Sequence, residues 1–365
     1  MSNDVGQLLL VGVPGTELES ETADMFRRVR PGGFILFGRN IQNPEQLRKL
    51  IDDLRDLSDV EPVITIDQEG GRVSRLRLIG EEPPNAQQLR DKGDPSLIRR
   101  HGELTAKILR LFGFNLDLCP VLDISFDDEA DNSLRGRCYG RGVAEVIANA
   151  EEFNAALRAG GVLSCGKHFP GYSMAGEDPH YGFPVIDRSR ADLEAHELAV
   201  FRHFAPLVDS MMIGHINYQS LEAEKRPASL SPAMINGLLR GDMGFAGLVM
   251  TDDLDMGAIL NTASFDDMLG LGLAAGNDLL MICHRVHQLD RAHEVLGQQP
   301  RALLDAALGR VADFKTKMQP ATLFSRAQFD EINREIWDLR VAVLGEERAR
   351  QRSTEAGSHS PVELY

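Results

Sequence analysis

The sequence predicts a (β/α)8 barrel, a fold of the α/β class, and three observations carry this prediction. Short apolar runs alternate with amphipathic segments along the chain, and there are eight of these runs. The chain has 365 residues with 43% hydrophobic content, which suffices for one large barrel domain. A doubly wound open sheet shows similar alternation and is the alternative. We assign the barrel to residues 1–317 and a C-terminal helical extension to residues 318–365.

The eight runs have the composition of strands that are buried on both faces, because they lack a polar alternation. They are Leu8–Val13, Gly33–Phe37, Val63–Ile66, Leu116–Leu122, Val162–Cys165, Met211–Ile213, Leu248–Met250 and Leu279–Ile282.

Helix signals lie between several of the predicted strands. Asn43 is expected to cap a helix whose first residue is Pro44 and whose apolar residues recur at helical spacing. Ser189 with Asp192, and Ser231 with Pro232, mark two further helix starts. The extension carries one predicted helix, Ala327–Leu344. The polar run Arg348–Ser360 that follows is expected to be loose or tethered to a partner subunit.

Composition excludes several functional classes. The net charge of −16 and the lack of basic runs argue against binding to nucleic acid or to an anionic membrane surface. The amino terminus has no basic region before its apolar run, and no stretch approaches the ~20 apolar residues that cross a bilayer. We expect a cytoplasmic enzyme, a monomer or homodimer, that acts on a small molecule. Its four cysteines lack metal-type spacing and are expected to be buried free thiols.

Polar residues follow most of the predicted strands, at the end where barrel active sites lie. They are Asp67, Asp123, Lys167, His168, His215, Asp252, Asp253 and His284. Asp at such a junction also caps the following helix well, and this is the alternative for Asp123 and Asp253. For Asp67 and Asp252 we favour a functional role, because each directly follows an apolar run beside other polar groups.

The end of the fifth predicted strand, where Lys167 and His168 lie, and the loop that it opens into carry two kinds of reactive group. Lys167 and His168 can donate hydrogen bonds to a polar ligand at the mouth of the barrel. Further along, Asp178 precedes His180 by two residues, and a carboxylate that accepts from one imidazole nitrogen raises the basicity of the other. Such a histidine can transfer a proton near neutral pH.

The chain resembles family 3 glycoside hydrolases, in particular the single-domain, NagZ-like bacterial β-N-acetylglucosaminidases of cell-wall recycling. The segments that carry the resemblance are Gly32–Asn40, Ile66–Val73, Arg137–Gly140, Lys167–Gly171, Pro227–Ser231 and Leu238–Leu254. The last is the most specific, because it is similar to the family's nucleophile signature, in which the Asp after Ser or Thr attacks the sugar. That residue is Asp252.

The resemblance implies a retaining hydrolase without metal or cofactor. Asp252 would form a covalent glycosyl-enzyme through an oxocarbenium-like transition state, which water then opens. His180, oriented by Asp178, would protonate the leaving oxygen and later activate water. Asp67 would bind sugar hydroxyls, and the residues expected to hold the ring are Arg137, Lys167 and His168.

Three further residues have weaker assignments. Arg72 and His215 are candidates for substrate contacts. The alternative for Arg72 is a structural bridge to Glu69, and the alternative for His215 is a buried scaffold position beneath the mouth. Asp278 is expected to hold the turn before the last strand, outside the site.

The chain departs from the family pattern at one place. Where relatives read Lys-His-Phe-Pro-Gly-His-Gly-Asp, this chain has Tyr172-Ser173-Met174 after Gly171, so a piece that contacts the sugar or shapes the loop has changed. Stacking of Tyr172 on a sugar face is one expectation, and plain loop packing is the other. Family β-glucosidases take their acid/base carboxylate from a second domain, for which this chain has no room, so His180 is the proton donor that the sequence offers.

Other functions remain open at this point. A phosphorylase is one, because a neutral histidine tolerates phosphate better than a carboxylate does and Lys167 and Arg137 are candidates for binding that anion. A β-glycosidase with changed sugar specificity and a non-catalytic sugar-binding protein are others. A Schiff-base aldolase built on Lys167 would leave Asp252 and the histidine dyad without a role.

Overall fold

The fold is an eight-stranded parallel barrel, as the sequence predicts. The computed structural model describes residues 5–130, 132–173, 184–260 and 262–353. Neighbouring strands follow the order β11-β9-β7-β6-β3-β2-β1-β12, and a parallel bridge between Met250 and Leu279 joins the two ends. The strands are β1 (Leu9–Gly12), β2 (Gly33–Leu36), β3 (Val63–Ile66), β6 (Leu116–Asp117), β7 (Leu163–Phe169), β9 (Ser210–Ile213), β11 (Leu248–Thr251) and β12 (Leu280–Ile282).

Two strands end more than one residue away from the predicted position. The regular part of β6 ends at Asp117 rather than Leu122, because Pro120 has no N–H to donate to the ladder; pairing returns as a bridge between Val121 and Lys167. By contrast, β7 continues to Phe169, with an irregular register after Gly166. Lys167 and His168 therefore belong to the strand itself, which places both side chains at the barrel mouth.

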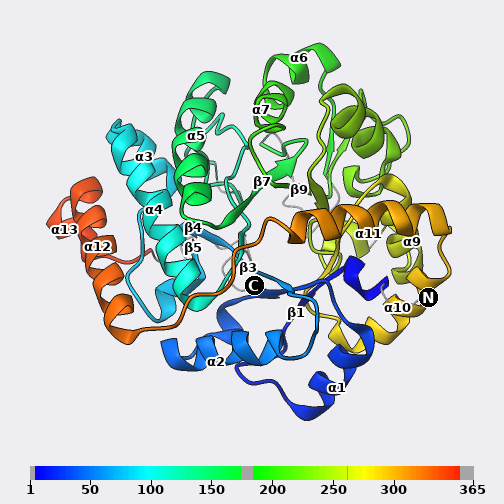
Figure 1. Cartoon of the computed structure of the whole chain (residues 1–365). Coiled ribbons are helices and arrows are strands. Elements are labelled where there is room, and N and C mark those ends of the chain that lie inside the picture. The colour runs from blue at the N-terminus through cyan, green and yellow to red at the C-terminus, as the bar shows by residue number, and fades with distance from the viewer. Residues whose placement is uncertain (1–4, 131, 174–183, 261, 354–365) are drawn as a thin grey trace.

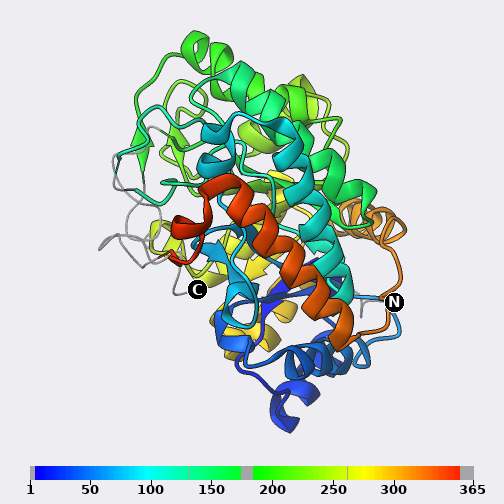
Figure 2. The same cartoon turned by 90° about the vertical axis from the view of Figure 1, so that its left-hand side faces the viewer.

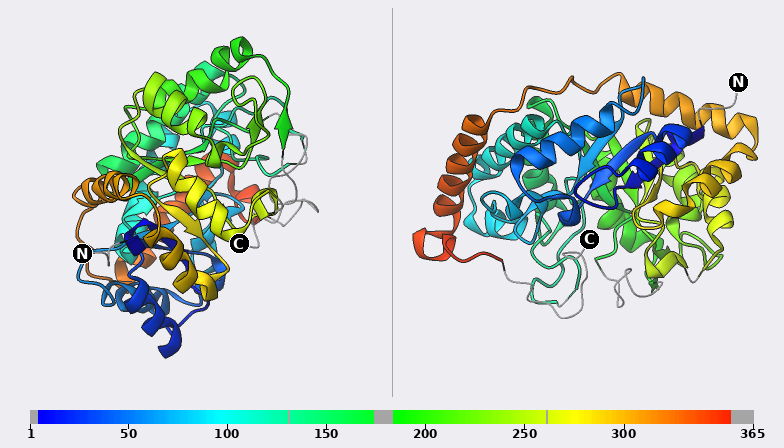
Figure 3. Two further views of the ribbon diagram at one scale, coloured as in Figure 1. Left: turned by 90° about the vertical axis from the view of Figure 1, so that its right-hand side faces the viewer. Right: turned by 90° about the horizontal axis from the view of Figure 1, so that it is seen from below.

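Helices surround the barrel on its outside (Figures 1 and 3). They are α1 (Ser20–Val29), α2 (Pro44–Arg55), α3 (Ala86–Lys92), α4 (Pro95–Phe112), α5 (Val143–Ala159), α6 (Arg190–Ala195), α7 (Glu197–Phe204), the π-helix η5 (Ala233–Asp242), α8 (Gly257–Leu260), α9 (Phe265–Ala275), α10 (Leu289–Gly297) and α11 (Arg301–Lys315). The predicted caps are confirmed: Asn43 accepts from the backbone N–H of Gln46, and Ser189 from that of Asp192. No helix among the described residues is long and apolar enough to span a bilayer.

Short elements in the loops shape the mouth. The antiparallel pair β4 (Gln68–Gly70) and β5 (Val73–Ser74) leads into the 3-10 helix η3 (Arg75–Leu78). Gly70 has φ +107°, and a Cβ there would lie 2.3 Å from the Pro84 carbonyl oxygen, so only glycine fits this turn. A second pair, parallel, consists of β8 (Val185–Ile186) and β10 (Asn217–Tyr218). The first of these excursions carries Glu69 and Arg75 back over the barrel.

Residues predicted to be structural have that role. The buried Asp278 accepts from the backbone N–H of Val249 at 2.9 Å and pairs with Arg240 and Arg310, so it ties the start of β11 to the turn before β12. The four cysteines are buried free thiols, as expected.

The C-terminal extension packs on the outside of the barrel. After α11 the chain crosses to α12 (Arg326–Leu344), which lies along α4, and α13 (Glu346–Ala349) follows (Figures 1 and 2). The ring of Phe112 in α4 contacts Phe324 and Phe329 at centroid distances of 5.6 and 5.7 Å. The helix begins one residue before the predicted Ala327. Residues 354–365 lie outside the described part of the chain, and the boundary at 317 stays a prediction.

Candidate active site

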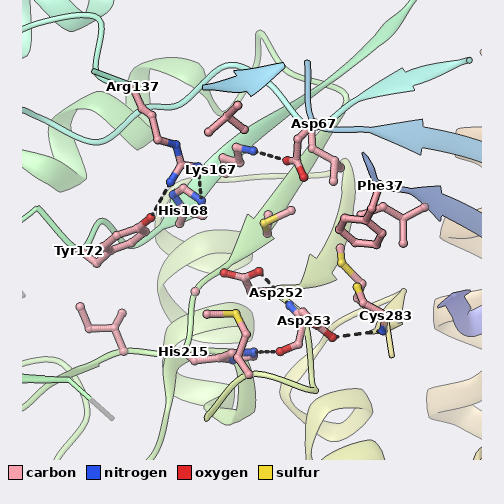
Figure 4. A pocket seen from close by; sticks show the side chains of 18 of the residues that line it. Phe37, Asp67, Arg137, Lys167, His168, Tyr172, His215, Asp252, Asp253 and Cys283 are labelled. Carbon is pink, nitrogen blue, oxygen red and sulfur yellow. Dashed lines mark hydrogen bonds and ion pairs between the residues drawn. The ribbon is translucent and has the colours of Figure 1, made fainter. Parts of the chain in front are cut away.

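A pocket opens at the carboxyl ends of the barrel strands (Figure 4). The residues that line it are Ile35, Phe37, Asp67, Val73, Arg75, Leu118, Arg137, Lys167, His168, Tyr172, Met212, Gly214, His215, Ile216, Asp252, Asp253, Met256, Met281 and Cys283. Six of the nine predicted site residues are therefore brought together. The polar groups form two sets, one around Lys167 and one around Asp252, with apolar side chains between them.

Asp252 directly follows β11 and points into the pocket. Its backbone N–H donates to the Ile213 carbonyl at 2.9 Å, and its Oδ1 accepts from the backbone N–H of Asp253 at 2.8 Å. Among the described residues nothing donates to its Oδ2. The side chain is thus held by one oxygen and presents the other to the cavity.

Lys167 is bound between two carboxylates. Its Nζ lies 2.6 Å from Asp67 Oδ1 and 2.6 Å from Glu69 Oε1. Burial opposes the charge on each group, but their mutual attraction outweighs it: the pKa of Lys167 is raised, and the pKa values of Asp67 and Glu69 are lowered. All three are charged at neutral pH. Because an ammonium has three donors, Lys167 keeps one N–H for a ligand.

The donors of Arg137 are fully used by the protein. Nε and Nη2 bind the two oxygens of Glu69 at 2.7 and 2.8 Å, and Nη1 donates to the Ser133 carbonyl at 3.0 Å and to the Tyr172 hydroxyl at 3.3 Å. The remaining N–H of Nη2 faces His168 Nε2 at 3.4 Å. A guanidinium has five N–H groups, so each is assigned. This geometry favours an organising role for Arg137 over the direct sugar contact that the resemblance implies.

His168 is held by a residue whose role the sequence left open. Asp123 Oδ2 accepts from the backbone N–H of His168 at 3.1 Å and lies 2.8 Å from its Nδ1, and Oδ1 accepts from the backbone N–H of Tyr172 at 2.9 Å. With Nδ1–H donating to Asp123 and Nε2 facing Arg137, we assign the neutral tautomer with Nε2 as acceptor. Asp123 therefore positions His168 rather than capping a helix.

Tyr172, the first residue of the departure from the family pattern, lies inside the pocket. Its ring is tilted against that of His168 at a centroid distance of 4.6 Å, and its hydroxyl contacts Arg137. Burial raises the pKa of this phenol, so it is neutral and able to donate. The altered loop thus changes the wall of the pocket.

Beneath Asp252 lies a second polar set. His215 Nδ1 is 2.7 Å from Ser229 Oγ and its Nε2 is 2.8 Å from the Asp253 carbonyl oxygen, which favours the scaffold alternative for this histidine. Asp253 Oδ1 accepts from the backbone N–H groups of Asp255 and Cys283. Burial, with repulsion from Asp255, raises the pKa of Asp253 to about 8.

The pocket is lined by Arg75 and not by Arg72, the arginine that the sequence analysis selects. Arg72 does not line the pocket; its Nη2 donates to the Ser133 carbonyl at 2.8 Å. Arg75, which sequence reasoning missed, does line it and lies 3.5 Å from Asp67 Oδ2. The only signal was its position three residues after Arg72 in a motif that returns to the mouth. The remaining predicted residues, Asp178 and His180, lie outside the described residues.

Comparisons with known proteins agree with this geometry. Residues 1–314 match the Glycosyl hydrolase family 3 N terminal domain. A β-hexosaminidase from Chromobacterium violaceum is 31% identical over 317 residues, which cover 83% of this chain and 86% of that protein. A β-hexosaminidase from Alkalilimnicola ehrlichii is 33% identical over 283 residues, 76% of this chain and 80% of that protein.

Solved structures give the same result. A family 3 β-N-acetylglucosaminidase from Paenibacillus sp. str. FPU-7 superposes with a TM-score of 0.86 and 31% identity, over 94% of this chain and 68% of that one. A β-N-acetylhexosaminidase from Beutenbergia cavernae has a TM-score of 0.79 and 27% identity, over 86% of this chain and 98% of that one. This chain therefore belongs to glycoside hydrolase family 3.

Proposed function

We propose that the protein is a retaining β-N-acetylglucosaminidase that removes terminal, non-reducing β-linked N-acetylglucosamine. Family membership and the names of its relatives support the reaction class and the sugar. The observation that carries the proposal is the placement of Asp252: its Oδ2 faces a cavity whose other wall presents the charged groups of Asp67 and Lys167.

Catalysis follows from that placement. Asp252 Oδ2 attacks the anomeric carbon while the bond to the leaving oxygen breaks, which gives a covalent glycosyl-enzyme. His180, two residues after Asp178 in the sequence, supplies the proton to the leaving oxygen. It then accepts a proton from the water that releases the sugar, so Asp252 is regenerated as a carboxylate. The fixed N–H of Asp253 stabilises the carboxylate that leaves in this second step.

The polar wall opposite Asp252 is suited to sugar hydroxyls. Asp67 is ionised and partly open to the cavity, so it accepts hydrogen bonds, and Lys167 offers its remaining N–H. His168 Nε2 faces an N–H of Arg137, so the His168 ring belongs to this wall without offering the sugar a free acceptor. Arg137 keeps Glu69, His168 and the Tyr172 hydroxyl in place. The sugar thus meets both donors and acceptors on one preorganised surface.

The same geometry weakens the phosphorylase alternative. Lys167 and Arg137 are the two cations that the sequence offers for phosphate. Lys167 already contacts Asp67 and Glu69, and Arg137 forms a bidentate salt bridge with Glu69. Binding of a dianion beside these carboxylates would require their neutralisation or displacement.

We further propose that the protein acts in cell-wall recycling in the cytoplasm and that its substrate has a muropeptide-like aglycone. We also propose that the enzyme is a monomer or a homodimer. Support for this comes from the resemblance in sequence. Release of N-acetylglucosamine from a purified disaccharide muropeptide, followed by mass spectrometry, tests the aglycone. A rate far below that for an aryl glycoside would remove this part of the proposal.

The proposed function is tested by hydrolysis of 4-nitrophenyl β-N-acetylglucosaminide and the matching β-glucoside, with and without phosphate. We expect turnover of the N-acetyl sugar, independent of phosphate, and loss of at least about 10³-fold in kcat for Asp252→Ala and His180→Ala. Asp338→Ala, at an exposed position of α12, is the matched control.

Azide distinguishes the nucleophile from the acid/base residue, because the two variants should give different anomers of the glycosyl azide. With Asp252→Ala, azide attacks in place of the carboxylate and gives the α-glycosyl azide. With His180→Ala, it attacks the glycosyl-enzyme and gives the β-anomer. A phosphate-dependent rate would replace the hydrolase by a phosphorylase, and an active Asp252→Ala variant would refute the nucleophile assignment.

A further inference from the structure

Four residues beyond the family domain hold the loop that directly follows Arg75, a residue that lines the pocket. We name Asn333, Arg340, Arg352 and Ser353 the C-terminal clamp. We propose that the C-terminal clamp positions residues 77–82 and thereby keeps Arg75 against Asp67 in the sugar site. The inference rests on the proposed function for its kinetic consequence, because Asp67 is there a sugar-binding group.

The loop begins inside the pocket. Arg75 lies 3.5 Å from Asp67 Oδ2, with its guanidinium 6.0 Å from the centre of the Phe37 ring. The next residue, Leu76, donates its backbone N–H to Gln68 Oε1 at 3.2 Å. A displacement of the loop therefore moves Arg75 relative to the carboxylate that it contacts.

The centre of the clamp is the buried carboxylate of Glu82, whose residue is 1% exposed. Arg340 Nη1 donates to Glu82 Oε1 and to the Glu82 carbonyl, both at 2.9 Å. Ser353 adds its hydroxyl at 2.8 Å and its backbone N–H at 3.2 Å. Arg77 Nη1 reaches the same carboxylate at 3.4 Å and the Ser353 carbonyl at 3.1 Å.

The remaining contacts bind the loop backbone. Asn333 Oδ1 accepts from the Glu81 N–H at 2.6 Å, and a Cβ on Gly80 would lie 2.4 Å from that oxygen. Arg352 donates to the Arg77 carbonyl at 2.8 Å and to the Gly80 carbonyl at 3.1 Å. The loop has no sheet partners between 79 and 82, so these side chains satisfy its backbone groups instead.

Docking of the extension does not require these polar groups. The apolar face of α12 already packs on α4 through Phe329, with Ile332, Ile336 and Leu339 buried along it. Burial of the Arg340–Glu82 charges is costly, and an apolar pair would stabilise the contact as well.

The likeness to the Paenibacillus enzyme covers 94% of the chain, which is more than residues 1–314, so it includes part of the extension.

The first test uses side chains at the edge of the clamp. We expect Asn333→Leu and Arg352→Ala each to lower kcat/KM about three- to tenfold, mainly through KM, because a hydrogen bond that fixes the binding wall is lost. Asn333→Asp keeps the acceptor for Glu81 and should stay within about twofold of wild type. Arg350→Ala is the control for Arg352, because Arg350 is also exposed but pairs with Glu346.

A control for stability is also needed. Val29→Ala, in the buried face of α1 away from the extension, lowers the melting temperature without touching the loop. If it raises KM as much as the clamp variants do at equal loss of melting temperature, the positioning role is refuted.

A second readout is independent of catalysis. In amide hydrogen exchange, the clamp variants should accelerate exchange at Leu76 and Glu81 while leaving the His168 amide, bound to Asp123, unchanged. Unchanged exchange at Leu76 overturns the inference. A wild-type protein inactive on every sugar would refute the proposed function, and the exchange pattern alone would then decide the clamp.

Discussion

Replacement of Glu69 by Gln tests the charge network under the sugar site. Gln keeps the shape and one acceptor but removes the charge that both Arg137 and Lys167 contact, at a position 5% exposed. Loss of one partner from a buried ion pair costs about 3–5 kcal/mol. With an unfolding entropy of about 2.1 cal/mol/K per residue, this corresponds to a melting temperature lower by about 4–7 °C at pH 7.

The difference in melting temperature between wild type and Glu69→Gln should depend on pH. The pKa of Glu69 is lowered from 4.5 in the folded protein, so its contribution to stability is present above pH 4.5 and is lost as pH falls toward the lowered value. The gap between wild type and Glu69→Gln should therefore be narrower at pH 3 than at pH 7.

Thermal melts followed by circular dichroism at both pH values measure this gap. Glu103→Gln is the control, because Glu103 pairs with Arg100 at the surface, where such a pair contributes about 0–1 kcal/mol. A drop for Glu69→Gln no larger than for this control, or a gap that widens at pH 3, would refute the reasoning.

Three further variants probe the pocket. Tyr172→Phe removes the hydroxyl that contacts Arg137 and should lower kcat/KM about 3–10-fold; an unchanged ratio between N-acetylglucosaminide and glucoside would exclude Tyr172 from sugar selection. Asp123→Asn removes the charged acceptor of His168 and should cost about 10–100-fold in kcat/KM, whereas retention of full activity would exclude a positioning role. The raised pKa of Asp253, about 8, predicts that activity falls above that pH as a second charge appears beside Asp252. Asp253→Asn should remove that limb of the pH profile of kcat/KM, and a persistent limb would assign it to another group.

Sequence patterns predicted the scaffold well because the relevant signals are local. Runs such as Val63–Ile66 are apolar on both faces, which only a strand covered on both sides tolerates, and this strand has the predicted bounds. Prediction was weaker where one residue interrupts a pattern. Pro120 shortens β6, and Lys167 and His168 extend β7 because their side chains turn inward to buried partners.

The sequence by itself determined the barrel, the family, and the set of polar residues that follow the strands, because periodicity and short motifs are properties of neighbouring residues. Only the tertiary structure decided which of those groups are free to meet a sugar. Arg137 and Glu69 are 68 residues apart in the chain, and Arg340 and Glu82 are 258 apart. Hydrogen-bond donors are used up by whichever acceptors folding brings within 3.5 Å, and no local pattern records those partners.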